Sequence, residues 1–338
     1  MQIQENVSLK DYNTFGIDVT ARYFISVSKP EEVKKVLDLK GYPELFLLGG
    51  GSNMLLTQDL ERLVVHLNLK GISVQEKGND KVWITAMAGE NWHDFTQWAL
   101  AQDYGGIENL SLIPGNIGTA PIQNIGAYGV ELKDVFVSCT VMDRATGEIR
   151  TLTKSDCQFG YRDSLFKKEA KDQYIILSVC LELTQKNHRK HTTYGAISAA
   201  LRARNIDNPS IQDVAEAVIG IRRQKLPDPK EIGNSGSFFK NPILSKTEFE
   251  QFSKQHTAAP FYALDDGNYK IPAGWLIEAS GLKGFTKGKA GVHKNQALVL
   301  VNYGGATGND IWEMAQYVQH TVIEKFGIKL VPEVNIIP

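Results

Sequence analysis

The chain has few cysteines and no long hydrophobic run, and both absences limit what it can be. Its three cysteines, Cys139, Cys157 and Cys180, are odd in number and have no C-x-x-C spacing. Neither a disulfide framework nor a zinc site is therefore predicted. No apolar run approaches membrane-spanning length, and the first residues lack a basic segment followed by an apolar one. We therefore expect reduced thiols, no metal site and a cytoplasmic protein.

The sequence also lacks an excess of charge of either sign. Its 37 Lys and Arg residues oppose 38 Asp and Glu residues, which leaves a net charge of -1. Without a bulk basic field, neither a nucleic acid nor a membrane surface is the expected partner, and any electrostatic binding is local. At 338 residues the chain exceeds a comfortable single core, so two or three domains are expected.

Two common nucleotide-binding patterns are missing as well. The pattern G-x-G-x-x-G fails because Met54 stands where the third glycine belongs, after Gly49 and Gly51. The P-loop pattern is approached at residues 284–290, which are one residue short between the glycines and end in Ala290 in place of Ser or Thr. Neither a conventional Rossmann dehydrogenase nor a P-loop NTPase is therefore predicted.

A strand that ends in three glycines is the most informative feature present. Residues 46–56 read FLLGGGSNMLL, and glycines there let successive N–H groups point into one anion-binding concavity. Ser52 and Asn53 add side-chain hydrogen bonds. A lone glycine cluster is more often an ordinary turn, but residues 113–129 form a second loop rich in glycine and small residues. Two such loops predict a long cofactor that carries phosphate.

Hydrophobic periodicity predicts a parallel βαβ unit near the start of the chain. Residues 22–27 and 45–48 read as strands, and the helix between them has Ser28 as N-cap, Pro30 in its first turn and Gly41 as its stop. Parallel strands joined in this way place the glycine turn at the carboxyl end of the second strand. Cofactor phosphates are expected at that edge.

The α+β pattern continues to the end of the chain, with a domain boundary near residue 212. Trp92, Phe95 and Trp98 are interpreted as core residues. Arg222, with Arg223 and Lys225, ends one predicted helix and fits either the helix dipole, which the spacing favours, or a cationic rim for a diphosphate. Further strands are predicted at residues 63–69, 82–88, 135–142, 174–183 and 297–301, and helices at 92–102, 210–225 with a Ser210/Asp213 capping box, 245–256 and 311–326.

Three short segments carry residues able to do chemistry. Ser237 lies between a glycine and two aromatics, but the G-x-S-x-G elbow is absent because Ser237 itself stands where the second glycine belongs. Arg162, in the sequence YRDS, fits a surface ion pair as well as an anion site. Glu333, near the C-terminal end, would by itself be assigned to solvent.

Taken together and in order, these motifs resemble the UDP-N-acetylenolpyruvoylglucosamine reductases of the Escherichia-like type. The resemblance spans nearly the whole chain. Tyr194 and Gly195, after the basic residues 188–191, are similar to the tyrosine loop of that family. The other matching segments are residues 13–16, 49–56, 113–129, 161–164, 225–229, 236–242 and 332–334.

The resemblance implies an α+β fold with a two-lobed FAD-binding domain of the vanillyl-alcohol-oxidase type and a C-terminal α+β substrate-binding domain. The implied boundaries are 1–72 and 73–212 for the two lobes, with the tyrosine loop near 188–196, and 213–338 for the substrate domain. It implies noncovalent FAD, NADPH, a UDP-sugar substrate and no metal, in a monomeric, cytoplasmic bacterial enzyme. Its product serves peptidoglycan synthesis, and through it cell wall biogenesis, cell shape and cell division.

The implied reaction passes a hydride from NADPH to the flavin, and from flavin N5 to C3 of UDP-N-acetylglucosamine enolpyruvate, which gives UDP-N-acetylmuramate. By resemblance, Arg162 stabilises the enolate, Ser237 protonates C2 and Glu333 is the third catalytic residue. Substrate contacts are implied for Tyr194, Lys225, Asn241 and Gln296. FAD contacts are implied for Gly49, Gly50, Gly51, Ser52, Asn53, Ile113, Gly115, Gly118, Thr119, Gln123, Asn124, Gly126, Tyr128 and Arg222.

Two alternatives stay open at this point. One is an FAD-dependent oxidase of the same fold, in which a histidine often tethers the flavin beside the glycine turn; Ser52 stands at that position here. The other is a protein that binds a UDP-sugar without turnover, and the presence of Arg162, Ser237 and Glu333 together argues against it.

Overall fold

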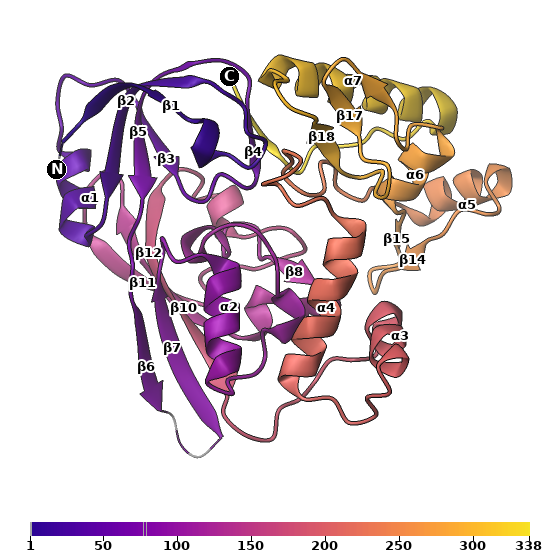
Figure 1. Ribbon diagram of the computed structural model, residues 1–338, viewed down its shortest axis with the longest axis horizontal. Helices are drawn as coiled ribbons and strands as arrows, with labels where there is room; N and C mark the ends of the chain where they lie inside the picture. The colour runs from indigo at the N-terminus through magenta and orange to yellow at the C-terminus, as the bar shows by residue number, and fades with distance from the viewer. Residues whose placement is uncertain (1, 77, 79) are drawn as a thin grey trace. The chain divides into compact units, whose positions relative to one another are not determined.

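The computed structural model describes residues 2–76, 78 and 80–338 (Figure 1). Contacts within the chain divide it into two compact units, each of which is discontinuous in sequence. Unit 1 comprises Met1–Asn6, Arg22–Gly50 and Glu61–Arg223, and unit 2 comprises Val7–Ala21, Gly51–Leu60 and Gln224–Pro338.

The first sheet, most of which belongs to unit 1, contains the predicted parallel strands. β3 pairs with β5 in parallel. Contacts of Arg22 with Glu61 and of Ser26 with His66 advance together along β2 and β5, so this pair is parallel as well. The parallel βαβ unit is confirmed, with β5 between its two strands. The order is β1-β2-β5-β3, with β1 at Gln4–Ser8, β2 at Thr20–Val27, β5 at Leu60–Leu67 and β3 at Leu45–Leu48.

Helix α1 (Pro30–Leu37) starts one residue later than the predicted cap implies. Its N-cap is Lys29, so the prediction of Ser28 as N-cap is wrong. The reason is that Glu32 reaches back and accepts hydrogen bonds from the backbone N–H groups of Ser28 at 2.8 Å and of Lys29 at 3.2 Å. The helix also ends before Gly41, at Leu37.

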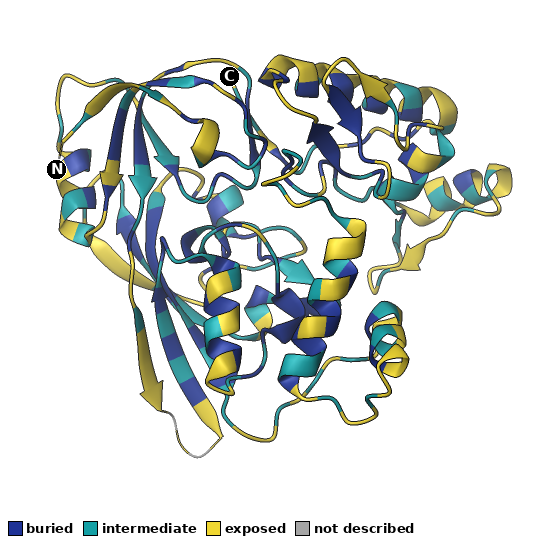
Figure 2. Ribbon diagram, viewed as in Figure 1, coloured by how far each residue is buried: buried dark blue, intermediate teal, exposed yellow. Residues whose placement is uncertain are grey.

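The second sheet of unit 1 is antiparallel, and helix α2 (Trp92–Ala101) packs on it. Trp92 and Phe95 are buried with the inward-facing strand residues, and Trp98 is partly buried against them, which confirms the predicted core. Figure 2 shows the buried positions along these strands. The order is β11-β10-β12-β7-β6, with β11 at Ile149–Thr153, β10 at Phe136–Asp143, β12 at Tyr174–Thr184, β7 at Lys81–Met87 and β6 at Ile72–Glu76.

Helix α4 (Ile211–Lys225) confirms the predicted capping box and apolar stripe. Ser210 and Asp213 exchange hydrogen bonds between side chain and backbone, at 2.9 and 3.1 Å. The stripe residues Ile211, Val214, Val218 and Ile221 are buried. Three other short elements are α3 at Gly195–Ala203, β8 at Gly126–Ala127 and β9 at Val130–Glu131. Elsewhere in the described residues, 3-10 helices lie at Lys10–Tyr12, Glu108–Leu110, Ile117–Thr119, Leu132–Asp134 and Leu165–Lys167.

Unit 2 is built around helix α7 (Gly308–Phe326), which packs on a small antiparallel sheet. Gly327 ends α7 with φ +66°, as predicted. The predicted strand at 297–301 is shorter, since β18 starts at Leu300, although Ala297 and Val299 are buried. The sheet is β16 (Thr286–Lys287), β17 (Ala290–Val292) and β18 (Leu300–Asn302).

A parallel strand pair joins two of the three sequence segments of unit 2. β19 (Asn335–Ile337) pairs with β4 (Met54–Leu56), the strand that follows the glycine turn. Helix α5 (Lys246–Gln255) begins at the Ser245 cap, as predicted. None of the helices in the described residues is long and apolar enough to cross a membrane. The other elements are α6 (Ala273–Ala279) and a sheet of β13 (Ile243–Leu244), β15 (Tyr269–Lys270) and β14 (Tyr262–Ala263).

Candidate functional site

In unit 1 the glycine turn packs directly against the second glycine-rich loop. A Cβ atom on Gly49 would lie 2.7 Å from Thr119 Cγ2. One on Gly50 would lie 2.8 Å from Asn116 Oδ1 and 3.0 Å from Gly115 Cα. Only glycine allows so close an approach. The two loops that the sequence assigned to one cofactor therefore lie side by side.

The remainder of the turn belongs to unit 2 and is held by its own contacts. Gly51 has φ +59°, and a Cβ there would lie 1.9 Å from the Tyr12 carbonyl oxygen. The Asn53 carbonyl accepts a hydrogen bond from Asn335 Nδ2 at 2.8 Å, and Asn53 Nδ2 donates to the Glu333 carbonyl at 3.4 Å. Glycine is thus required at position 51 by both conformation and space.

Two buried polar atoms just before the second loop have no partner in the described part of the chain. They are Asn109 Oδ1 and Ser111 Oγ. An unsatisfied buried polar atom costs about 1–3 kcal/mol. A polar ligand bound at this loop would remove that cost. Sequence reasoning did not single out these two residues, although polar side chains directly before a glycine-rich loop could have marked them.

Leu112, next in sequence, is held from both sides. Arg222 Nε donates to its carbonyl at 3.2 Å, and its N–H donates to His93 Nδ1 at 3.0 Å. Burial lowers the pKa of Arg222, while the charge and hydrogen bond of Tyr128 oppose that shift. Burial likewise lowers the pKa of His93. The helix-end arginine thus anchors the second glycine-rich loop, a role that helix position alone did not indicate.

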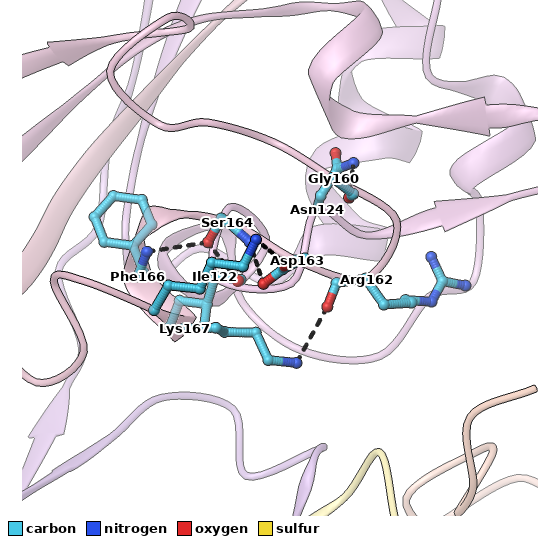
Figure 3. Close-up of polar contacts among 9 residues, drawn as sticks. Ile122, Asn124, Gly160, Arg162, Asp163, Ser164, Phe166 and Lys167 are labelled. Atoms are coloured by element: carbon cyan, nitrogen blue, oxygen red, sulfur yellow. Dashed lines mark hydrogen bonds and ion pairs between the residues drawn. The ribbon is translucent and has the colours of Figure 1, made fainter. Parts of the chain in front are cut away.

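Arg162 stands on a two-residue turn that is closed by Gly160 and Asp163 (Figure 3). The Gly160 N–H donates to the Asp163 carbonyl at 3.0 Å, and the Asp163 N–H donates to the Gly160 carbonyl at 3.3 Å. Arg162 has a backbone φ of +54°, which residues other than glycine rarely adopt. Its Nη2 donates to the Gly126 carbonyl at 2.8 Å, so the guanidinium is held against β8.

Two further side chains support this turn, as Figure 3 shows. Lys167 Nζ donates to the Arg162 carbonyl at 3.2 Å. Ser164 Oγ donates to the Ile122 carbonyl at 2.6 Å and accepts from the Phe166 N–H at 3.2 Å. The turn is therefore tied to the second glycine-rich loop through Ile122 as well as through the guanidinium.

Tyr194 immediately precedes α3 and packs on the second glycine-rich loop. Its ring lies edge-on to Tyr128, with ring centroids 5.3 Å apart and an interplanar angle of 89°. Its side chain is about half exposed, at 49%. The structure therefore leaves one side of the tyrosine open to solvent.

Ser237 and Glu333 lie on neighbouring extended segments of unit 2. Ser237 forms a β-bridge with Val299, and the Phe238 N–H donates to the Leu298 carbonyl at 2.8 Å. On the other side, the Glu333 N–H donates to the Phe238 carbonyl at 2.8 Å. Ser237 is exposed and Glu333 is half-buried. The structure thus places these two predicted residues on adjoining segments, whereas Arg162 belongs to unit 1.

The predicted substrate contacts Asn241, Gln296 and Lys225 also belong to unit 2. Asn241 Oδ1 accepts from the Ala273 N–H at 2.9 Å and so fixes the start of α6. Gln296 Oε1 accepts from the Leu298 N–H at 3.4 Å. Lys225, the last residue of α4, is exposed.

The remaining residues predicted to contact the cofactor differ in their packing and hydrogen bonds. A Cβ on Gly118 would lie 2.5 Å from Ala88 Cβ, so glycine is required there for packing. Thr119 Oγ1 donates to the Asn116 carbonyl at 2.8 Å. Asn124 is buried. Ile113, Gly115, Gln123 and Gly126 lie in the same loop of unit 1, and Ser52 lies in unit 2.

Comparison with known proteins defines the class first. Residues 21–153 match the family model described as FAD binding domain. The close approach of the two loops, which only glycine allows, fits a large, polar cofactor of this kind. So do the buried oxygens of Asn109 and Ser111, which have no partner among the residues that the structure describes. The fold is thus that of an FAD-binding protein.

The relatives narrow the class to a family. Residues 228–337 match the model described as UDP-N-acetylenolpyruvoylglucosamine reductase, C-terminal domain. A UDP-N-acetylenolpyruvoylglucosamine reductase of Flavobacterium johnsoniae is 56% identical over 337 residues, covering 100% of both chains. That of Pseudomonas putida is 48% identical over 339 residues, covering 99% of both. The chain belongs to the UDP-N-acetylenolpyruvoylglucosamine reductase family.

A solved structure supports the fold. The crystal structure of the UDP-N-acetylenolpyruvylglucosamine reductase of Thermus caldophilus aligns with a TM-score of 0.69 and 24% identity, covering 100% of both chains. The predicted family, the α+β class and the FAD-binding domain followed by a C-terminal domain are therefore confirmed.

Proposed function

We propose that the chain reduces UDP-N-acetylglucosamine enolpyruvate to UDP-N-acetylmuramate for peptidoglycan synthesis, with NADPH as reductant. The 56% identity with a full-length reductase supports this reaction. NADPH is proposed to use the same site as the substrate in turn, because the sequence has no separate dinucleotide pattern. The location of the protein in the cytoplasm, its monomeric state and its division into three domains at residues 72 and 212 stay predictions.

FAD supplies the hydride chemistry of this reaction when it is bound. We propose that the two glycine-rich loops hold it, with the glycine turn at its diphosphate. Backbone N–H groups of glycine-rich turns bind such anions. Asn109 and Ser111, whose buried oxygens lack partners in the described residues, are proposed as additional donors or acceptors toward it.

The role proposed for Arg162 follows from the charge that the reaction creates. Hydride addition at C3 of the enolpyruvyl group leaves negative charge on C2 and its carboxylate, which fixed cations stabilise. A guanidinium stays charged at any working pH and grips a carboxylate through two parallel hydrogen bonds. The hydrogen bond from Arg162 Nη2 to the Gly126 carbonyl orients the group before substrate arrives.

Ser237 is proposed to donate the proton to C2. The Oγ–H bond breaks as the C2–H bond forms, and the alkoxide then regains a proton from solvent. A hydroxyl is a weak acid, but an enolate is a strong enough base if the two are well aligned. Backbone hydrogen bonds of Phe238 to Leu298 and to Glu333 hold the serine segment on both sides and provide that alignment.

Glu333 is proposed to contact the same end of the substrate. A carboxyl group kept protonated in a dry site donates a hydrogen bond to a developing anion. Tyr194, Lys225, Asn241 and Gln296 are proposed to contact the nucleotide portion, with the lysine near its diphosphate. The observation that carries the proposal is the Glu333 N–H to Phe238 carbonyl hydrogen bond, which places the serine and the carboxylic acid on adjoining segments.

The two half-reactions, followed separately, test this function. Under anaerobic conditions NADPH should bleach the yellow enzyme, and only the enolpyruvyl nucleotide should restore the colour. Ser237→Ala should leave bleaching unchanged and slow recovery by about 10²–10⁴-fold, the usual contribution of a proton donor. Ser253→Ala in α5 is the matched control and should behave as wild type. Equal damage to both half-reactions by Ser237→Ala, or recovery with oxygen alone, would contradict the proposal.

A further inference from the structure

Asn124 is buried, and its side chain lies beside Gly160 (Figure 3). Its Nδ2 donates to the Gly160 carbonyl at 3.0 Å and to Glu131 Oε2 at 3.0 Å. Its Oδ1 accepts from the Lys133 N–H at 3.0 Å. Both donors of the amide and one of its acceptor sites are thus used. The side chain has no free donor for a cofactor.

The Gly160 carbonyl closes the turn that contains Arg162. It accepts from the Asp163 N–H at 3.3 Å as well as from Asn124, and a carbonyl has lone pairs for both. Arg162 has the left-handed φ of +54°. Such a conformation persists only where the surrounding structure holds it. Asn124 supplies one of those holding contacts.

The same short segment also holds the other end of Arg162. Two residues after Asn124, the Gly126 carbonyl accepts from Arg162 Nη2 at 2.8 Å. Gly126 pairs with Glu131 in the β8–β9 hairpin, and Glu131 in turn accepts from Asn124 and bonds to Lys133 Nζ at 2.7 Å. One hydrogen-bonded hairpin therefore sets both the turn and the guanidinium.

We propose that Asn124 is a positioning residue, which fixes the Gly160 carbonyl and thereby holds Arg162 ready for the substrate carboxylate. This inference rests on the proposed function, in which Arg162 binds that carboxylate. It assigns the Asn124 side chain to the arginine turn, whereas the family resemblance placed the residue among the FAD contacts. Asn124 itself does not touch the substrate.

Two substitutions of Asn124 test the role of its side-chain amide separately from that of its backbone conformation. Asn124 has φ +45°, which glycine adopts freely, so Asn124→Gly removes the amide without adding backbone strain. Asn124→Asp keeps the size but replaces the donating nitrogen with an oxygen that faces Glu131 and the Gly160 carbonyl. We expect both variants to bind FAD and to be bleached by NADPH at the wild-type rate. Recovery with the enolpyruvyl nucleotide should slow by about tenfold or more, or about 1.4 kcal/mol.

A double-mutant cycle with Arg162→Ala tests whether Asn124 acts through the arginine. If it does, Asn124→Gly adds nothing to the slow recovery of Arg162→Ala, because coupled residues are not additive. Additive effects would overturn the inference. If Arg162→Ala alone recovers at the wild-type rate, the proposed function has failed instead. Asn6→Gly, at an exposed asparagine with φ +55°, is the matched control and should behave as wild type.

Loss of FAD by folded position-124 variants would also overturn the inference, since it would assign the side chain to the flavin. If neither variant folds, a crystal structure of the wild-type holoenzyme with the enolpyruvyl nucleotide decides. We expect Asn124 Nδ2 on the Gly160 carbonyl and Arg162 on the substrate carboxylate. An amide turned toward FAD would refute the assignment.

Discussion

Gly126 shows how little space surrounds the arginine of the site. Its carbonyl holds the Arg162 guanidinium, and a Cβ atom on it would lie 3.1 Å from Arg162 Nη1 and 2.9 Å from Glu131 Cγ. These two neighbours are parts of flexible side chains, but the third, the Val130 carbonyl oxygen at 3.1 Å, belongs to the backbone. A methyl group here therefore displaces the guanidinium and also presses on the β8–β9 hairpin that holds it.

Gly126→Ala should fold and bind FAD, but its recovery with the enolpyruvyl nucleotide should slow by about tenfold, or about 1.4 kcal/mol. Anaerobic stopped-flow absorbance measures this rate. Gly220→Ala is the control, because that exposed glycine of α4 has no neighbour within 4 Å of the added atom. It should keep the wild-type rate and gain about 0.5–1 kcal/mol of stability. A wild-type rate in folded Gly126→Ala would show that the guanidinium position is not critical.

Helix α2 joins the core of the second sheet to the second glycine-rich loop. Its Phe95 is buried in that core. At its N-terminal end, the Trp92 N–H donates to the Gly115 carbonyl at 2.9 Å, and His93 accepts from the Leu112 N–H at 3.0 Å. The helix therefore fixes the loop at two points, and one of them depends on a neutral imidazole.

This dependence predicts how stability changes with pH. Burial lowers the pKa of His93 below its ordinary 6.5, and Arg222 and Arg223 lower it further while Asp94 opposes them. Below pH 6.5 the unfolded chain binds this proton more readily than the folded chain does, so the free energy of unfolding falls as the pH drops. Above pH 6.5 the contribution of His93 to stability is fully present. Burial shifts the pKa values of His66 and His293 in the same direction.

Urea unfolding between pH 5.5 and 7.5 should show this loss on the acid side. His93→Gln should flatten the dependence, because its side chain does not titrate. Equal slopes for the variant and the wild type would mean that His93 contributes nothing to it.

The whole chain carries its proposed chemistry on two units. Unit 1 contains Arg162 and the second glycine-rich loop, and unit 2 contains Ser237 and Glu333. The glycine turn contributes to both, since Gly50 belongs to unit 1 and Gly51 to unit 2. A ligand that binds this turn is expected to raise the free energy of unfolding.

FAD should stabilise the protein against heat and should leave it on denaturation. Ligand at 100 times its dissociation constant adds about 2.7 kcal/mol to the free energy of unfolding. Melting curves of the apoprotein with and without FAD measure this gain, and riboflavin, which lacks the diphosphate, should give less. After acid precipitation the yellow colour should be in the supernatant, because Ser52 replaces the tethering histidine. Colour retained in the pellet would indicate a covalent flavin.

Local features of this fold could be predicted from the sequence because they depend on neighbouring residues. The Ser210/Asp213 box and the Gly327 stop are examples, since each depends on residues within one turn of its helix. Even there, Glu32 moved the start of α1 by accepting from Ser28 and Lys29, a competition that residue preferences did not resolve.

Contacts between distant segments could not be predicted in this way. The insertion of β5 between β2 and β3 leaves no periodic signal in either strand. The bond from Asn124 to Gly160 joins residues 36 positions apart, and the sequence of neither segment indicates the other as its partner. The family resemblance supplied the candidates Arg162, Ser237 and Glu333, but not the hydrogen bonds that hold them.

The parallel pair of β4 and β19 also has a consequence for synthesis on the ribosome. Thr57 is bonded to Ile337, which lies 280 residues further along the chain, because its N–H and its hydroxyl both donate to the Ile337 carbonyl. At about 5–20 residues per second, β4 is synthesised on the order of 15–60 s before that partner. Throughout this interval the apolar residues Met54–Leu56 lack the strand that pairs with them in the folded protein, and an unpaired apolar edge favours association with other chains.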